Sequence, residues 1–190
     1  MGLTAWAYPL AESLLAEPLP RRWNHCLGVA ERARSLAPIL GEDAELLEAA
    51  AVLHDIGYSP DLAKTGFHPL DGARYLRDNT DADERVIRLV AHHSCAWMEA
   101  EARGLREELE AEFPRERPEL ADALCHCDMN TTPDGTPTNP VDRVNEIAGR
   151  YGADSLIGRF IRRAEPEILA CSARVLARLS EAGREAAQPM

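Results

Sequence analysis

Seven histidine and aspartate residues in this chain have types and spacing that could bind a metal ion. Almost all of them fall where a helical apolar pattern calls for a core residue. Burying that many ionisable groups without partners costs several kcal/mol each. A metal centre removes this cost, because neutral imidazole and carboxylate groups are ligands of first-row transition metals. The residues are His25, His54, Asp55, His68, His92, His93 and Asp128.

The helical periodicity places these side chains on the apolar faces of separate helices. Apolar residues recur three or four positions apart and end in a ligand-type residue, as expected for one buried helix face. The stripes are Leu47-Ala50-His54, Val86-Val90-His93 and Leu120-Leu124-Asp128, and His25 lies one turn before Val29. Because several helices each direct such a side chain inward, we expect a helical bundle with a metal site in its core.

The pattern predicts an all-α chain without a convincing alternating strand. We expect one domain over 1–190, with a core of about 20–130 and C-terminal helices at 140–183 packing on it. Residues 130–139 are rich in turn formers, and both a functional loop and a solvated connector remain open for them. The predicted helices are 20–36, 43–55 (ended by Gly57), 68–77, 83–96, 98–112, 119–128, 140–151 (capped by Asn139) and one from about 165.

Composition excludes several classes of function. The net charge of −11 argues against phosphate-backbone binding as the main activity and against anionic membrane surfaces. The sequence contains no run long enough to cross a membrane. Five cysteines form no C-x-x-C pair, and their odd number favours a reducing compartment. We therefore expect a cytoplasmic protein that binds neither nucleic acid nor membrane.

The order of four of these residues resembles the signature of the HD superfamily of metal-dependent phosphohydrolases. That signature is a histidine, then His-Asp, then a distant Asp, matched here by His25, His54-Asp55 and Asp128. The resemblance implies an all-α fold in which these four residues bind a metal. His68 and one histidine of the 92–93 pair match the additional ligands of binuclear members.

By the same resemblance, Asp55 bridges two divalent transition metals, with iron or manganese expected first and zinc or cobalt as alternatives. His25, His54 and Asp128 would bind one metal, and His68 with His93 or His92 would bind the other. Helix phase favours His93, because His92 shares its face with Arg88 and Glu99. We expect catalytic roles for His54 and Asp55, and for His92 either a proton-donor role or the alternative ligand position.

Among HD proteins, the segment His68-Pro69-Leu70-Asp71-Gly72-Ala73 is similar to that of small bacterial diadenosine-tetraphosphate hydrolases, whose proline falls at a slightly different place. The cyclic-dinucleotide branch carries Gly-Tyr-Pro after the paired histidines, whereas this chain has Cys95-Ala96-Trp97. The resemblance therefore disfavours hydrolysis of cyclic dinucleotides.

The expected reaction is attack of a metal-activated water on a phosphoester or phosphoanhydride of a nucleotide-like small molecule. Lys64, Arg74 and Arg143 are the candidate phosphate-binding residues. Two alternatives remain: a di-iron oxygenase of the same fold, and a non-catalytic module that senses a nucleotide or a metal. The protein is expected to be a monomer or a homodimer.

Overall fold

The computed structural model describes residues 2–186, and it confirms the all-α prediction. Within that range the regular structure is helical, and the β-type pairing is limited to one bridge between Thr131 and Pro137. No helix in the described range is long and apolar enough to span a membrane. Residues 1 and 187–190 of the predicted domain lie outside the described residues.

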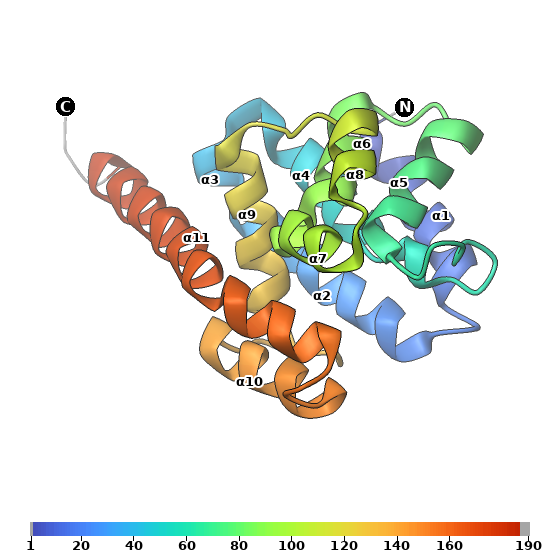
Figure 1. Ribbon diagram of the computed structural model, residues 1–190. Coiled ribbons are helices and arrows are strands. Elements are labelled where there is room, and N and C mark those ends of the chain that lie inside the picture. Colours follow the sequence, from blue (N-terminus) through green and yellow to red (C-terminus); the bar gives the residue numbers. More distant parts are fainter. Residues whose placement is uncertain (1, 187–190) are drawn as a thin grey trace.

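Helices follow one another through short connections (Figure 1). Between residues 2 and 186, three short 3₁₀ turns interrupt them: η1 (Gly41–Asp43), η2 (Ile56–Tyr58) and η3 (His93–Cys95). The α-helices are α1 (Leu3–Leu15), α2 (Pro20–Ser35), α3 (Ala37–Leu40), α4 (Ala44–Leu53), α5 (His68–Asn79), α6 (Glu84–His92), α7 (Ala96–Arg103), α8 (Arg106–Glu112), α9 (Pro118–Met129), α10 (Pro140–Tyr151) and α11 (Leu156–Ala186).

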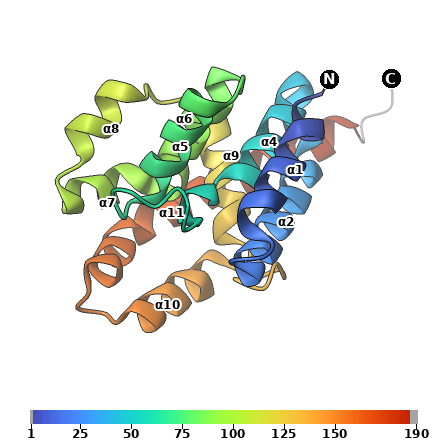
Figure 2. The same cartoon turned by 90° about the vertical axis from the view of Figure 1, so that its right-hand side faces the viewer.

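The helices pack around two adjoining apolar clusters. The larger one is built by α1, α2, α4, α5, α6 and α9, with fully buried residues such as Leu47 and Leu70 at its centre. The smaller one joins α9 to α10 and α11 through Val144 and Ile168. Figures 1 and 2 show α11 as a long helix that runs beside α9, with α10 at one end of it. Thus α9 contributes to both clusters.

Several predicted helix boundaries are confirmed. Proline occupies the first position of α2 and α10, where its missing N–H removes no helical hydrogen bond. The side chain of Asn139 accepts a hydrogen bond from the Asp142 N–H and caps α10 as expected.

Other boundaries were wrong, and each has a physical reason. Helix α1 was not predicted, although Ala7, Ala11 and Leu15 form its buried stripe. The predicted helix 83–96 ends at His92, because His93 is extended and the following Ser94 and Cys95 adopt left-handed backbone angles. The predicted helix 98–112 breaks at Gly104, whose φ is +73°.

The last helix also differs from its prediction. It begins at Leu156, and Pro166, which is typical of a first helical turn, lies inside it. The apolar side chains of Ile161, Ala164 and Ile168 continue one buried stripe on both sides of the proline. Burial of this stripe stabilises the helix across the position where the proline removes a backbone donor.

Gly57 has a different role from the one predicted for it. Helix α4 ends at Leu53, and Gly57 is not in the left-handed region that favours glycine at a helix end. A Cβ atom at Gly57 would lie 2.0 Å from the carbonyl oxygen of His68. Glycine therefore permits the close approach of η2 to the first turn of α5, which brings His68 beside Asp55.

The loop 130–139 packs against α2 and is no free connector. A Cβ atom at Gly28 would lie 2.2 Å from the carbonyl oxygen of Gly135, so the two backbones are in direct contact. Arg21 forms a bidentate ion pair with Asp134 in the same loop. The Thr132 carbonyl of this loop accepts a hydrogen bond from His25 Nδ1 at 2.9 Å, which ties the loop to the candidate site.

This contact predicts that Gly28→Ala destabilises the protein. The added methyl group must push the 130–139 loop away from α2, and overpacking of this kind costs about 1–3 kcal/mol of unfolding free energy. Gly149→Ala, on the open surface of α10, is the matched control and should stabilise by about 0.5–1 kcal/mol. Urea denaturation of the two variants measures both effects. Equal stabilities would show that the loop does not need this close contact.

Candidate metal centre

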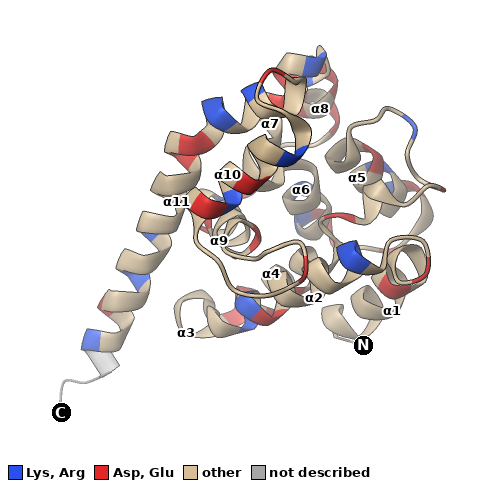
Figure 3. Ribbon diagram, turned by 90° about the horizontal axis from the view of Figure 1, so that it is seen from below, with Lys and Arg blue, Asp and Glu red and all other residues tan. Residues whose placement is uncertain are grey.

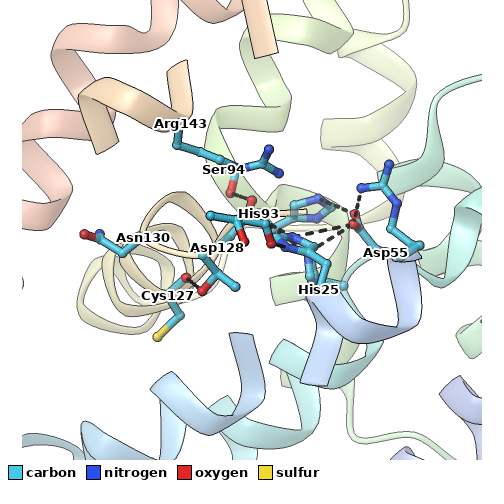
Figure 4. A network of polar contacts seen from close by, with 12 residues as sticks. His25, Asp55, His93, Ser94, Cys127, Asp128, Asn130 and Arg143 are labelled. Atoms are coloured by element: carbon cyan, nitrogen blue, oxygen red, sulfur yellow. Dashed lines mark hydrogen bonds and ion pairs between the residues drawn. The ribbon is translucent and has the colours of Figure 1, made fainter. Parts of the chain in front are cut away.

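Side chains from five parts of the chain converge on one buried point (Figure 4). His25 projects from α2, His54 and Asp55 follow the end of α4, and Asp128 lies in the last turn of α9. The remaining two are His68, the first residue of α5, and His93, which follows α6. Apart from His68, which is partly exposed, these side chains are nearly inaccessible to solvent.

The two carboxylate oxygens of Asp55 face different pairs of histidines. Its Oδ2 lies 3.4 Å from His54 Nε2 and 3.9 Å from His25 Nε2. Its Oδ1 lies 3.2 Å from His68 Nε2 and 3.7 Å from His93 Nε2. Asp55 is therefore shared by two groups of donor atoms. Within each group, the donor atoms lie within 4.8 Å of one another.

Three of the histidines are oriented by backbone carbonyls. The Nδ1 atom of His25 donates to Thr132, that of His54 donates to Ala51 at 2.7 Å, and that of His93 donates to Val90 at 2.7 Å. Because a carbonyl only accepts, the proton of each neutral ring lies on Nδ1 and its Nε2 carries the lone pair. Metal-binding histidines are typically held in this way, with the free nitrogen turned toward the ion.

The contacts between these atoms fit a metal centre. His54 Nε2 is fully buried and has no hydrogen-bond partner, which is costly for a polar atom unless a ligand satisfies it. His25 Nε2 lies 3.0 Å from Asp128 Oδ1, so a lone pair faces a carboxylate oxygen. A cation between these atoms relieves both problems, and imidazole with carboxylate suits iron, manganese, cobalt or zinc.

Electrostatics hold His93 and the two carboxylates in metal-binding form, whereas burial of His54 is outweighed by Asp55, which raises the pKa of that ring, so His54 must release a proton when it binds a metal. Burial, together with the neighbouring His68 and His54, lowers the pKa of His93 to about 3, so this ring is neutral. Burial alone would raise the pKa of Asp55, but His54 and Arg22 outweigh it and hold this pKa well below its usual range. Burial of Asp128 is likewise outweighed by its hydrogen bond to His25, and its pKa is lowered. Both carboxylates are therefore ionised.

A cavity of about 80 Å³ opens beside this cluster and is lined by several arginines. Of these arginines, only Arg143 was predicted from the sequence. Arg143 is buried, pairs with Glu146, and its Nε has no hydrogen-bond partner; it points toward Ser94 and His93 (Figure 4). Arg150 lines the same cavity. An anion inside the cavity would complete the hydrogen bonding of Arg143.

Arg22 is a second site residue that the ligand pattern missed. Its Nη1 lies 2.6 Å from Asp55 Oδ2, and its guanidinium stacks 3.9 Å above the ring of Tyr58. Tyr58 in turn stacks on His68, with 3.8 Å between ring centroids. A signal was available for Arg22, because it precedes His25 by three residues and therefore shares its helix face.

The structure does not bring His92 to the cluster. Its Nε2 donates to the Phe113 carbonyl at 2.6 Å on another side of α6, because adjacent helical residues point about 100° apart. Ser94, two residues further along the chain, instead reaches the site and donates to Asp128. This contact depends on a left-handed turn, with φ of +47° at Ser94 and +62° at Cys95, which no residue pattern indicates.

Two of the three predicted phosphate-binding residues also lie elsewhere. Lys64 is exposed and lines a separate cavity with Arg74, because Asp71 accepts the backbone N–H groups of Lys64 and Thr65 and holds that loop away from the site. Arg74 is bound to Glu112 and to Glu108 on α8. Only Arg143 of the three lines the cavity at the cluster.

Comparison with known proteins identifies the family. The family model described as HD domain matches residues 22–129, and the chain therefore belongs to the HD-domain family. This segment contains all the residues of the cluster, whereas α10 and α11 lie beyond it. No solved structure matches the chain.

The curated relatives share only part of their length with this chain. Ribonuclease Y of Rubrobacter xylanophilus is 36% identical over 36% of this chain and 13% of its own length. A deoxyguanosinetriphosphate triphosphohydrolase-like protein of Azorhizobium caulinodans is 39% identical over 36% of this chain and 17% of its own. A protein with the same description from Corynebacterium diphtheriae is 28% identical over 79% of this chain and 32% of its own. The chain thus spans less than a third of each of these relatives.

The geometry predicts different metal contents for variants of the two adjacent histidines. We expect about two transition-metal ions per wild-type chain purified without added metal or chelator, and loss of both in Asp55→Ala. His93→Ala should retain about one ion, because only one group of donors loses a member. His92→Ala, the matched control, should retain both. Elemental analysis of the purified proteins measures this. A deficit in His92→Ala with full occupancy in His93→Ala would contradict the geometry.

Proposed function

We propose that this protein is a metal-dependent phosphohydrolase that holds two divalent transition metals, iron or manganese, and acts on a phosphorylated, nucleotide-like small molecule. One observation carries the proposal: Asp55 is shared by two groups of donors and faces a cavity that arginines line. His25, His54 and Asp128 would hold one metal with Asp55, and His68 and His93 the other. Membership of the HD-domain family supports the same assignment.

The cavity suits a phosphoryl group. Arg22, Arg143 and Arg150 line it together with the metal-binding side chains, and arginine is the residue best matched to phosphate oxygens. Arg143 keeps an unpaired Nε for such an oxygen. The opposite wall, formed by Ile147 on α10 and Phe160 on α11, is apolar and would exclude bulk water from the reacting groups.

When bound, the metals would supply a water of lowered pKa and polarise a phosphoryl oxygen. The chain's own residues do the positioning. Asp55 and Asp128 provide the negative charge that retains the cations, and the Ser94 hydroxyl fixes the orientation of Asp128. Arg143 and Arg22 would bind the remaining phosphoryl oxygens and offset the charge that develops on them during in-line displacement.

The choice of a small molecule over RNA rests on the charge of the chain. The relatives include proteins described as ribonuclease Y and as deoxyguanosinetriphosphate triphosphohydrolase-like. This chain carries a net charge of −11, and a polyanion binds best to a basic surface. In the view of Figure 3, Lys and Arg are interspersed with Asp and Glu over the described residues. A nucleoside di- or triphosphate or a dinucleoside polyphosphate is therefore the substrate class to test first.

The proposal predicts that manganese- or iron-loaded protein releases phosphate or pyrophosphate from members of this class. Asp55→Asn should reduce turnover to background, because it removes the charge shared by the two metals. A panel of nucleotides, followed by chromatography of the products, tests this. Oxygen consumption by the iron form with an organic substrate would instead support an oxygenase. A tightly bound nucleotide without turnover would support a sensor module.

Arg143 offers a test of substrate binding alone. Arg143→Gln should raise KM about tenfold or more while the metal content stays unchanged, because it removes a charge-assisted hydrogen bond to phosphate. Lys64→Ala is the matched control and should leave KM and kcat unchanged, since Lys64 lines another cavity. Steady-state kinetics on the best substrate of the panel give both values. An effect of Lys64→Ala as large as that of Arg143→Gln would place the phosphate elsewhere.

A further inference from the structure

One buried carboxylate lines the cavity beside Asp55 without belonging to the candidate metal centre. Glu99, on α7, is 6% exposed and lines this cavity together with Tyr58 and His68. Among the described residues, the two donor groups that share Asp55 do not include it. A buried carboxylate is unfavourable unless partners replace its lost hydration, so the partners of Glu99 indicate what it is held there to do.

Only one of the two oxygens of Glu99 is bound within the described part of the chain. The Nε and Nη2 atoms of Arg103, one turn further along α7, each lie 2.7 Å from Glu99 Oε1. Between residues 2 and 186, Oε2 has no hydrogen-bond partner, and unlike the unpaired Nε of Arg143 it is not fully buried. Glu99 Oε2 is therefore an unoccupied acceptor in a side chain that lines the cavity.

Arg103 also fixes the position of this carboxylate. Its guanidinium carbon lies 5.8 Å from the centre of the ring of Phe67, a fully buried residue that directly precedes His68. Burial is the main cause of the raised pKa of Tyr58, and the negative charge of Glu99 adds to it, in agreement with this placement. Glu99 is thus held at the side of the cavity formed by η2 and the start of α5.

The charge of Glu99 determines which part of a substrate can lie against it. The same cavity carries Arg22, Arg143 and Arg150, which suit phosphoryl oxygens, whereas a carboxylate repels them. A carboxylate held by a guanidinium accepts hydrogen bonds and donates none. The part of the substrate that faces Glu99 therefore carries a hydroxyl or an amine in place of a phosphate.

We propose that Glu99 determines specificity by accepting a hydrogen bond from a ribose hydroxyl of the substrate, so that the protein prefers ribonucleotides to deoxyribonucleotides. This inference rests on the proposed function, in which a nucleotide is the substrate. Of the hydrogen-bond donors in a nucleotide, the ribose hydroxyls are nearest to the phosphate, and the base amino groups lie beyond the sugar. Carboxylates also bind a ribose hydroxyl in dinucleotide-binding folds.

A substrate without this hydroxyl would leave Glu99 Oε2 without a partner. Binding of the substrate displaces water from the cavity, and a deoxyribonucleotide offers only a C–H group at the vacant position. An acceptor that loses its water without gaining a donor is unfavourable. Sites that hydrogen-bond a substrate hydroxyl therefore discriminate strongly against analogues that lack it.

Kinetics on ATP, GTP and their 2′-deoxy and 3′-deoxy forms test the proposal with the manganese-loaded protein. We expect kcat/KM of the wild type to favour the ribonucleotide over at least one deoxy form by about tenfold or more. Glu99→Gln should reduce this preference severalfold and leave the metal content unchanged. Arg103 would hold the amide oxygen, so an NH₂ group replaces Oε2 and the hydroxyl loses its charged acceptor.

Glu101→Gln is the matched control on the same helix. Its carboxylate pairs with Arg163 outside the cavity, so this variant should keep the wild-type preference. A purely structural role of Glu99 would lower kcat/KM for ribo- and deoxyribonucleotides equally.

The outcomes separate this inference from the proposed function. Turnover without a preference, a preference for the deoxy forms, or a preference that Glu99→Gln retains in full would overturn the role of Glu99 and leave the phosphohydrolase standing. If the nucleotides bind without turnover, calorimetric affinities give the same ratio and decide the role of Glu99 in the same way. Neither turnover nor binding would overturn both.

Discussion

The buried carboxylate of Asp55 is the constraint on which the rest of this structure depends. A carboxylate in a protein core is tolerated only when paired charges and hydrogen bonds replace its lost hydration. Here four imidazoles from different parts of the chain surround it, together with Arg22, which shares α2 with His25. The arrangement of α2, α4, α5 and α6 can be understood as the packing that delivers these groups to one carboxylate. The fold and the site are thus specified together.

Helix ends, more than helix interiors, give the site its geometry. His54 and His93 directly follow the last residues of α4 and α6, and each bonds back to a carbonyl of its own final turn. After α6, the left-handed backbone at Ser94 and Cys95 is a conformation that costs about 1–3 kcal/mol for such residues. This turn places the Ser94 hydroxyl on Asp128. Backbone strain at this point therefore contributes to the geometry of the candidate metal centre.

The cavity at the cluster is completed by helices beyond the family match. Residues 22–129 provide all the candidate ligands, but Arg143, Arg150 and the apolar wall come from α10 and α11. In the proposed function, the HD-domain segment would supply the metal chemistry, and the C-terminal helices would determine which phosphorylated molecule fits.

The sequence predicted the residues that patterns can reveal and missed those that depend on tertiary geometry. The periodic stripes ending in His54, His93 and Asp128 predicted the convergence that the structure shows, because burial and helical phase are local properties. Lys64 and Arg74 were expected to bind phosphate, but Asp71 and Glu112 hold them elsewhere. Ser94 reaches the site because it and Cys95 adopt left-handed backbone angles. Loop 130–139 contacts α2 because Gly28 and Gly135 let the two backbones approach closely. Neither leaves a periodic signal.

The most direct test of this account is anomalous X-ray diffraction from crystals of the manganese-loaded protein. The account predicts two anomalous peaks flanking the carboxylate of Asp55, one among His25, His54 and Asp128 and the other between His68 and His93. Peaks only at sites remote from Asp55, or none under saturating manganese, would contradict the central claim that this buried carboxylate is shared by two metals.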